Sequence, residues 1–263
     1  MRLIASTALA LLLAGCISVD NDDDVTNELG NEVSRETLTL NGFWDGQFDQ
    51  TGDLRVLIYQ GTVYALDATQ GYYGTISLDE TTQIAVMELT SYLITASDET
   101  ALHYLADGTT QSYVMEGLAY STTTSADTLV GDYENDTSAG NFLLSDDGTW
   151  DNNASISQVV GQWSAGDYSL YIEPLAGTAS LRAITSVTGG CTFDGYITPV
   201  DSDFNLYSVS ITERKNCDDY NAKDVRGYAT LTANGELEFF IRGSELVYYM
   251  IFSAVAADDE TDA

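Results

Sequence analysis

The feature that most constrains the fold is a succession of short runs rich in β-branched and aromatic residues, separated by turns that contain Gly, Asn or Asp. Such runs occupy residues 54–60, 62–68, 74–79, 84–92 and 111–120. Residues 168–173 alternate apolar and polar side chains, which indicates a strand with one buried and one solvent-facing side. Strands at intervals of about 8 to 12 residues favour an all-β fold of antiparallel barrels or sandwiches. Only residues 98–105 leave a helical turn open.

Two short stretches have the residues of tight turns. Asn234-Gly235 joins the runs at 230–233 and 236–242, and Asn-Gly supplies the positive φ angles of a type I′ turn. Asp146-Asp147-Gly148 predicts a second hairpin, which returns through Thr149-Trp150. In the run at 236–242 one side carries Leu237, Phe239 and Ile241, and the other carries Glu236, Glu238 and Arg242. We therefore expect one face of that strand to be buried and the other to be wet.

The N-terminus reads as an export signal. Met1-Arg2 is followed by an apolar run from Leu3 to Leu13. This run is too short to span a bilayer, which needs about 20 residues. It ends in Leu13-Ala14-Gly15-Cys16, which resembles the lipobox of bacterial envelope lipoproteins. The resemblance implies that residues 1–15 are cleaved, that Cys16 becomes the lipidated first residue, and that its fatty acids, palmitate included, anchor the protein. Ile17, where proteins retained at the inner membrane usually have Asp, favours the outer membrane, on either its periplasmic or its surface side.

The composition is strongly acidic. The formal net charge is −32, and removal of the signal takes away Arg2 and leaves 8 basic and 41 acidic residues, or −33. Such a charge repels nucleic acid and bare anionic lipid, so we expect neither as a partner. Residues 16–36 combine acidic side chains with few apolar ones, which predicts a disordered tether between the lipid and the folded part.

Two tandem β units are predicted behind the tether, over residues 37–123 and 128–255, followed by an acidic tail at 256–263. The boundary is placed where Ser and Thr cluster between runs. An internal match supports this division: Leu40-Asn41-Gly42-Phe43-Trp44 parallels Leu129-Val130-Gly131-Asp132-Tyr133, and Gly71-Tyr72-Tyr73 parallels Gly161-Gln162-Trp163. Chance matching in a chain rich in Gly and Tyr is the alternative.

Two further resemblances concern the folded part. Gly42-Phe43-Trp44 resembles the opening Gly-x-Trp of lipocalin-like barrels, which implies an aromatic plug at one barrel end and an apolar ligand inside. The final third of the chain, with Cys191-Thr192-Phe193-Asp194-Gly195-Tyr196-Ile197-Thr198 and Gly227-Tyr228-Ala229, resembles a segment of uncharacterised proteobacterial lipoproteins. That family implies no activity.

Cys191 and Cys217 are the two cysteines that remain once Cys16 is lipidated. In an oxidising envelope this pair predicts a disulfide, which would close a loop of 217−191=26 positions and stabilise the fold by roughly 3 kcal/mol. A redox or metal-binding pair is the alternative, but the spacing is not C-x-x-C and no His lies nearby.

Motifs of catalysis are scarce. The chain has no G-x-S-x-G, phosphate loop or H-E-x-x-H, and its single histidine, His103, lies among apolar residues. We therefore predict no catalytic residue, metal site or cofactor. Asp146-Asp147 and Asp201-Ser202-Asp203 could serve hydrolysis or calcium binding, but turn formation is the favoured interpretation.

The function expected from these features is noncatalytic binding of an envelope protein, a glycan or an apolar small molecule at an unknown site. A structural role in the envelope and a carboxylate-dependent hydrolase are the alternatives. The oligomeric state is left open. Tyrosines are candidates for a glycan-stacking surface, although barrel packing is the favoured use. They are Tyr72, Tyr73, Tyr92, Tyr104, Tyr113, Tyr120, Tyr248 and Tyr249.

Overall fold

The computed structural model describes residues 25–26, 32–33, 38–48, 52–97, 101–105, 111–121, 126–176, 178–185, 190, 192–216, 225–243 and 246–256 of the 263-residue chain. The chain divides into two compact units, Met1–Thr37 and Leu38–Ala263. In the first unit, β1 (Val25–Thr26) and β2 (Glu32–Val33) form a short antiparallel pair. The predicted signal peptide lies outside the described residues, as do most of the predicted tether and the predicted acidic tail.

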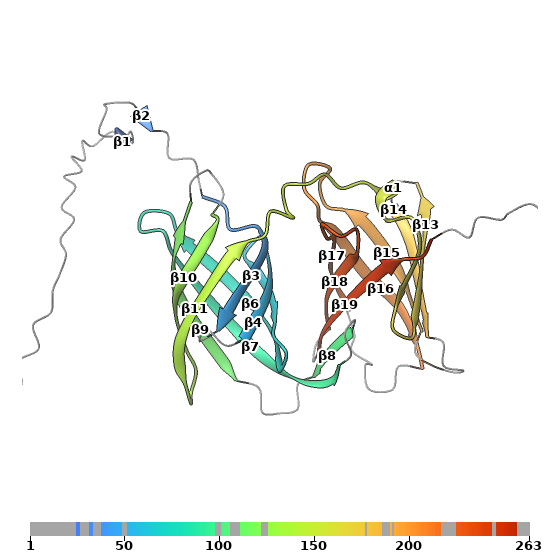
Figure 1. The fold of residues 1–263 in the computed structure, drawn as a ribbon, viewed down its shortest axis with the longest axis horizontal. Coiled ribbons are helices and arrows are strands. Elements are labelled where there is room, and N and C mark those ends of the chain that lie inside the picture. Colours follow the sequence, from blue (N-terminus) through green and yellow to red (C-terminus); the bar gives the residue numbers. More distant parts are fainter. Residues whose placement is uncertain are drawn as a thin grey trace, which may run out of the picture. The chain divides into compact units, whose positions relative to one another are not determined.

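The second unit contains two closed antiparallel barrels of eight strands each, which confirms the all-β prediction (Figure 1). The first barrel consists of β3 (Gly42–Phe48), β4 (Gly52–Tyr59), β5 (Thr62–Leu66), β6 (Gln70–Asp79), β7 (Ile84–Ser97), β9 (Ser112–Tyr120), β10 (Thr128–Glu134) and β11 (Ala139–Asp146). The second consists of β12 (Gly161–Ala165), β13 (Tyr168–Leu175), β14 (Thr178–Thr185), β15 (Thr192–Pro199), β16 (Tyr207–Lys215), β17 (Arg226–Leu231), β18 (Leu237–Arg242) and β19 (Leu246–Ala254). Pairing of β11 with β3 closes the first barrel, and pairing of β12 with β19 closes the second.

The predicted boundary at residues 123–128 is wrong. β10 pairs with β9 and β11 pairs with β3, so both strands belong to the first barrel. The chain leaves that barrel after Asp146 and reaches the second through a connection that contains α1 (Ile156–Val159). The predicted boundary therefore falls between two strands of one barrel, β9 and β10, rather than between two barrels.

The architectural repeat is also different from the predicted one. Gly42-Phe43-Trp44 corresponds to Gly161-Gln162-Trp163, since each opens the first strand of a barrel. Both tryptophans are buried in the barrel core, and each donates its indole N–H to the main-chain carbonyl four residues earlier. The distances are 3.3 Å from Trp44 Nε1 to Leu40 O and 2.8 Å from Trp163 Nε1 to Val159 O. Leu129–Tyr133, by contrast, lies in β10 of the same barrel as Trp44.

Each barrel interior is filled by its own cluster of side chains, as an eight-stranded barrel allows. The first cluster includes Trp44, Met87 and Phe142, and the second includes Trp163, Leu170 and Phe252. All six are no more than 5% exposed. An apolar ligand of the lipocalin kind would have to displace such side chains.

A third hydrophobic cluster joins the two barrels. It is formed by outward residues of β3–β5 in the first barrel, including Phe43 and Tyr64, and of β18 and β19 in the second, including Phe240 and Tyr249. β18 is consequently buried on both sides, and the expectation that Glu238 faces water is wrong. The side chains of β18 do alternate between two faces, but the face predicted to meet solvent is covered by the first barrel.

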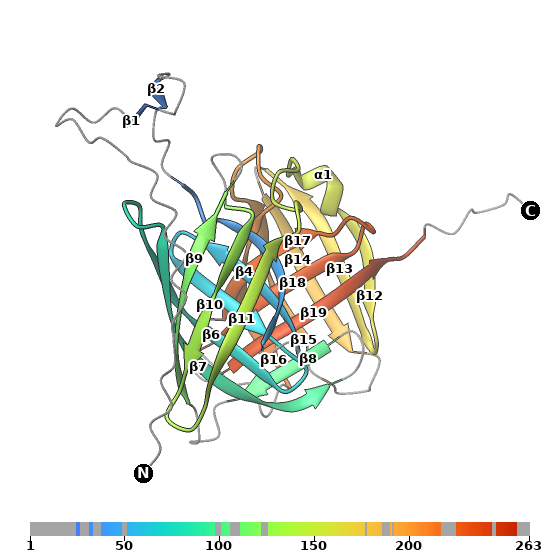
Figure 2. The same cartoon turned by 60° about the vertical axis from the view of Figure 1, so that its left-hand side comes forward.

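One extra strand, β8 (Ala101–Leu105), also links the barrels. It pairs with the end of β7 on one side and with β19 on the other (Figure 2). Residues 101–105 are therefore a strand, and the helical turn left open for this stretch is absent from them.

The turns differ in detail from the sequence-based expectation. Gly235 has a φ of +75°, and β17 and β18 form the predicted hairpin, but their last pair, Leu231 with Leu237, encloses five residues rather than two. Gln60 and Gly61, with φ values of 47° and 75°, form the two-residue turn of positive φ between β4 and β5. Asp146-Asp147-Gly148 ends the first barrel and forms no hairpin.

Candidate functional site

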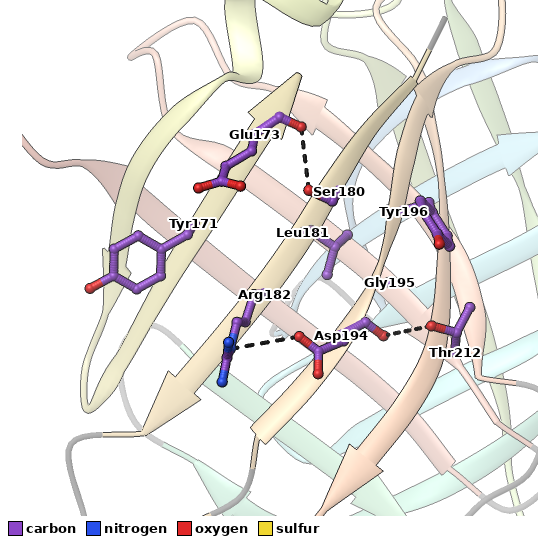
Figure 3. Close-up of a pocket in the computed structure, with 9 residues that line it drawn as sticks. All are labelled: Tyr171, Glu173, Ser180, Leu181, Arg182, Asp194, Gly195, Tyr196 and Thr212. Atoms are coloured by element: carbon purple, nitrogen blue, oxygen red, sulfur yellow. Dashed lines mark hydrogen bonds and ion pairs between the residues drawn. The ribbon is translucent and has the colours of Figure 1, made fainter. Parts of the chain in front are cut away.

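An open groove lies on the outer surface of the second barrel, across β13 to β16. Its volume is about 430 Å³. It is lined by Tyr171, Glu173, Ser180, Leu181, Arg182, Asp194, Gly195, Tyr196 and Thr212, as Figure 3 shows. We call this the strand-face groove.

Strand alternation explains why these side chains face outward. Leu170 and Ile172 point into the barrel and are buried, so Tyr171 and Glu173 between and after them point to solvent. In β15, Tyr196 likewise alternates with buried Ile197. The groove is thus the polar side of a sheet whose apolar side forms the barrel core.

A β-bulge shapes the far wall of the groove. The register between β15 and β16 shifts between Asp194 and Gly195, which leaves Thr212 as the extra residue. The Thr212 hydroxyl donates to the Asp194 carbonyl at 3.3 Å. A Cβ on Gly195 would lie 2.1 Å from the Ser210 carbonyl oxygen, so only glycine permits this close approach of the two strands.

Two tyrosines stand at opposite sides of the groove, with Arg182 and Asp194 between them (Figure 3). Tyr171 is 39% exposed and Tyr196 is 47% exposed. They lie two strands apart and two residues out of line, since Asp194 and not Tyr196 is in line with Tyr171. Their backbones are therefore roughly 11–12 Å apart, which is wider than a direct ring contact. Both rings therefore keep a free face.

The polar groups of the groove are loosely engaged with one another. Arg182 Nε lies 3.7 Å from Asp194 Oδ1, and their side chains are 64% and 38% exposed. The Ser180 hydroxyl donates to the Glu173 carbonyl oxygen at 3.4 Å. An exposed ion pair of this kind contributes little stability, so its groups are available to a ligand at low cost.

A second pocket adjoins the groove, and Tyr196 lines both. This junction pocket has a volume of about 370 Å³ and lies between residues of the two barrels. Its walls are Thr62, Tyr64 and Tyr73 from the first barrel and Tyr196, Thr198, Ser208, Val209, Ser210, Arg226, Gly227 and Tyr228 from the second. Tyr64 packs edge-on against Tyr73 and Tyr228, with ring centroids 5.1 and 5.9 Å apart.

The tyrosines singled out from the sequence are mostly packing residues. Among the eight, Tyr72, Tyr92, Tyr104, Tyr113 and Tyr249 are buried, while Tyr120 is 49% exposed on the first barrel. The groove tyrosines, Tyr171 and Tyr196, were missed. The signal that identifies them is an aromatic residue at an outward, otherwise polar position of an alternating strand.

The two carboxylate pairs form turns, as favoured. Asp147 accepts the Thr149 amide at 2.7 Å and pairs with Arg55, with 2.7 Å between Oδ2 and Nη1. Asp201 accepts the Asp203 amide at 3.0 Å. Burial raises the pKa of Asp146, whose carboxylate accepts the Gly148 amide.

Several predicted sites lie outside the described residues, namely lipidated Cys16, the proposed disulfide partners Cys191 and Cys217, and the side chain of His103. Within the described part of the chain, no group of three or more His, Cys, Asp or Glu side chains is placed to hold a metal ion. No helix in that part is long and apolar enough to cross a bilayer. Comparisons with known protein families, characterised proteins and solved structures find no match to this chain.

Proposed function

We propose that this chain is a noncatalytic binding protein of the bacterial envelope, attached to the outer membrane by the lipid on Cys16, and that the strand-face groove binds a saccharide. The observation that supports it is the pair of half-exposed tyrosines, Tyr171 and Tyr196, on either side of loosely engaged polar groups. Aromatic faces suit the apolar faces of sugar rings, and the carboxylates, hydroxyls and guanidinium suit their hydroxyl groups.

The same groups argue against hydrolysis. A carboxylic general acid needs apolar surroundings that keep it protonated. Glu173 is exposed and Asp194 is paired with Arg182, so neither has such surroundings. We infer that a bound sugar chain is held and released unchanged.

The test is a glycan array probed with the full chain, followed by titration of the best ligand. Tyr171→Ala and Tyr196→Ala should each weaken binding roughly 5- to 10-fold, the effect of one lost aromatic contact. Tyr120→Ala is the matched control, because Tyr120 is as exposed as Tyr196 but lies on β9 of the first barrel.

Binding that survives both groove substitutions would contradict the proposal, and so would the absence of any retained glycan. Recovery of shortened sugar chains after incubation would show an enzyme instead. Cys16→Ser should release the protein from membranes without changing its affinity for the sugar.

A further inference from the structure

A row of outward side chains connects the strand-face groove with the junction pocket. The strand registers place Glu173 opposite Ser180, Ser180 opposite Tyr196, and Tyr196 opposite Ser210. Ser210 in turn lies opposite Arg226, and Arg226 opposite Arg242. A ligand that lies across β13 to β15 can therefore continue along the same row to two arginines.

The arginine pair at the end of this row has no counter-ion among the residues that the structure describes. Like charges directly opposite on neighbouring strands repel each other. Among the described residues, no carboxylate lies within ion-pairing distance of Arg226 or Arg242. Arg242 Nε is buried without a hydrogen-bond partner there, and its guanidinium carbon lies 3.7 Å from the centre of the Tyr73 ring.

This arrangement is unexpected in so acidic a chain. Residues 42–146 hold one basic and 16 acidic residues, whereas residues 161–254 hold six basic and 12 acidic residues, so the net charges are −15 and −6. The net negative charge of the second barrel is thus much smaller, and two of its six cations lie opposite each other on β17 and β18. Arg226 lines the junction pocket, and Arg242 packs against Tyr73 in the wall of that pocket. Carboxylates are abundant in the sequence, yet none of the described ones neutralises this pair.

We propose that the junction pocket binds an oxyanion substituent of the saccharide, so that the ligand is an acidic sugar chain. Guanidinium groups present paired N–H donors that fit carboxylate, sulfate or phosphate oxygens. Tyr64, Tyr73 and Tyr228 supply ring edges and faces around the same space. Because the whole protein repels dense polyanions, the fitting ligand has isolated anionic groups rather than a continuous phosphate backbone. This inference rests on the saccharide function proposed above.

Nuclear magnetic resonance of the full chain can test both statements separately, with glucuronate and glucose as probes. Ring signals of Tyr171 and Tyr196 should shift with either sugar, which reports the groove. The Nε–H signals of Arg226 and Arg242 should shift with glucuronate and not with glucose. Glucuronate should bind about tenfold more tightly than glucose, which is the effect of one charge-assisted contact.

The double variant Arg226→Gln, Arg242→Gln should remove the preference for glucuronate and keep the affinity for glucose. Lys215→Gln is the matched control, because it removes one positive charge from the exposed end of β16. A thermal melt of each variant verifies folding.

If both sugars shift the tyrosines equally and the arginines do not respond, the anion site is refuted and the saccharide function stands. A preference for glucuronate that persists in the double variant, or one that Lys215→Gln removes equally, also refutes it. No response to either sugar would refute both proposals.

Discussion

Two arginine sites at the junction of the barrels have opposite surroundings. Arg55 on β4 is surrounded by acceptors: its Nε and Nη2 lie 2.9 and 2.6 Å from the two carboxylate oxygens of Glu238. Its Nη1 contacts Asp45 at 3.1 Å and Asp147 at 2.7 Å. Arg226 and Arg242, on β17 and β18, have no carboxylate partner among the described residues. Arg55 thus joins the barrels through carboxylates of its own chain, whereas the pair Arg226 and Arg242 meets none in the described part of the chain, as the proposed oxyanion site requires.

The Arg55 site is also the more deeply buried part of the junction. The Arg55 side chain is 17% exposed and that of Glu238 is 3% exposed. Burial alone would lower the pKa of Arg55, but its hydrogen bonds with Glu238 and the charges of Glu238 and Asp147 outweigh that effect and raise it. Tyr249 donates to Glu238 Oε1 at 2.6 Å, so the buried carboxylate is fully engaged.

The largest expected effect is that of Arg55→Ala. It leaves Glu238 buried without its counter-ion, which should lower the free energy of unfolding by about 3–5 kcal/mol. Urea unfolding measures this loss, and Arg182→Ala, in an exposed pair, should change stability by less than about 0.5 kcal/mol. The double variant with Glu238→Ala should cost less than the sum of the single changes. Equal stability of Arg55→Ala and Arg182→Ala would show that the Arg55 ion pairs contribute no more than an exposed pair.

Alkaline pH should destabilise both sites through one buried tyrosine in each. Burial raises the pKa of Tyr64 beside the arginine pair, and burial followed by the charge of Glu238 raises that of Tyr249. A raised pKa means that the folded state keeps the proton, so the stability is complete below the ordinary pKa near 10 and is lost as the pH rises above it. At pH 11 each tyrosine should cost about 1.4 kcal/mol.

Urea unfolding from pH 8 to 11 measures how stability falls with pH. Tyr64→Phe with Tyr249→Phe should make the fall at pH 11 about 2.8 kcal/mol smaller, while other tyrosines whose pKa burial raises, such as Tyr72 and Tyr104, account for the remainder. Tyrosinate absorbance of both residues in the still-folded protein at pH 11 would contradict the prediction.

Removal of the Tyr249 hydroxyl tests whether its hydrogen bond to the buried Glu238 carboxylate stabilises the fold. Tyr249→Phe deprives a buried carboxylate of one donor and should lower the free energy of unfolding at pH 7 by about 1–2 kcal/mol. Tyr171→Phe, which removes a hydroxyl from the exposed groove, should leave stability within about 0.5 kcal/mol. A neutral result for Tyr249→Phe would show that water replaces the hydroxyl.

The smallest expected effect has the opposite sign. Arg226→Gln relieves repulsion from Arg242 across the strands and should raise the free energy of unfolding by about 0.2–1 kcal/mol. Arg55→Gln, the matched change at the other site, should lower it. A loss of stability in Arg226→Gln comparable to that in Arg55→Gln would mean that Arg226 is structural.

The fold class is predictable from the sequence because alternation along a strand is a local property. Leu237, Phe239 and Ile241 form the predicted buried face and lie in the second barrel core. The opposite face, with Glu238 and Phe240, is covered by the first barrel, and only contacts distant in sequence determine that. The boundary failed for the same reason: the pairing of β11 with β3 joins residues about a hundred positions apart.

The candidate site was less accessible to prediction. Tyr171 lies in the alternating run at 168–173, but nothing in the local sequence distinguishes it from a solvated tyrosine. Its candidate role depends on Arg182 and Tyr196, which the barrel brings into the same groove. The arginine pair emerges from the register of β17 and β18, which set two residues 16 positions apart opposite each other.

The position of β8 between the two barrels determines which strand pairings can form early and which must form last during folding. β8 precedes β9 in the chain, yet one of its partners is the last strand, with Leu105 opposite Leu246. Closing so long a loop is slow, and until β19 arrives one edge of β8 has no partner and can recruit another chain. A chain that folds from its N-terminus can therefore finish most of its first barrel early, but it remains vulnerable to aggregation until its C-terminal strand pairs with β8.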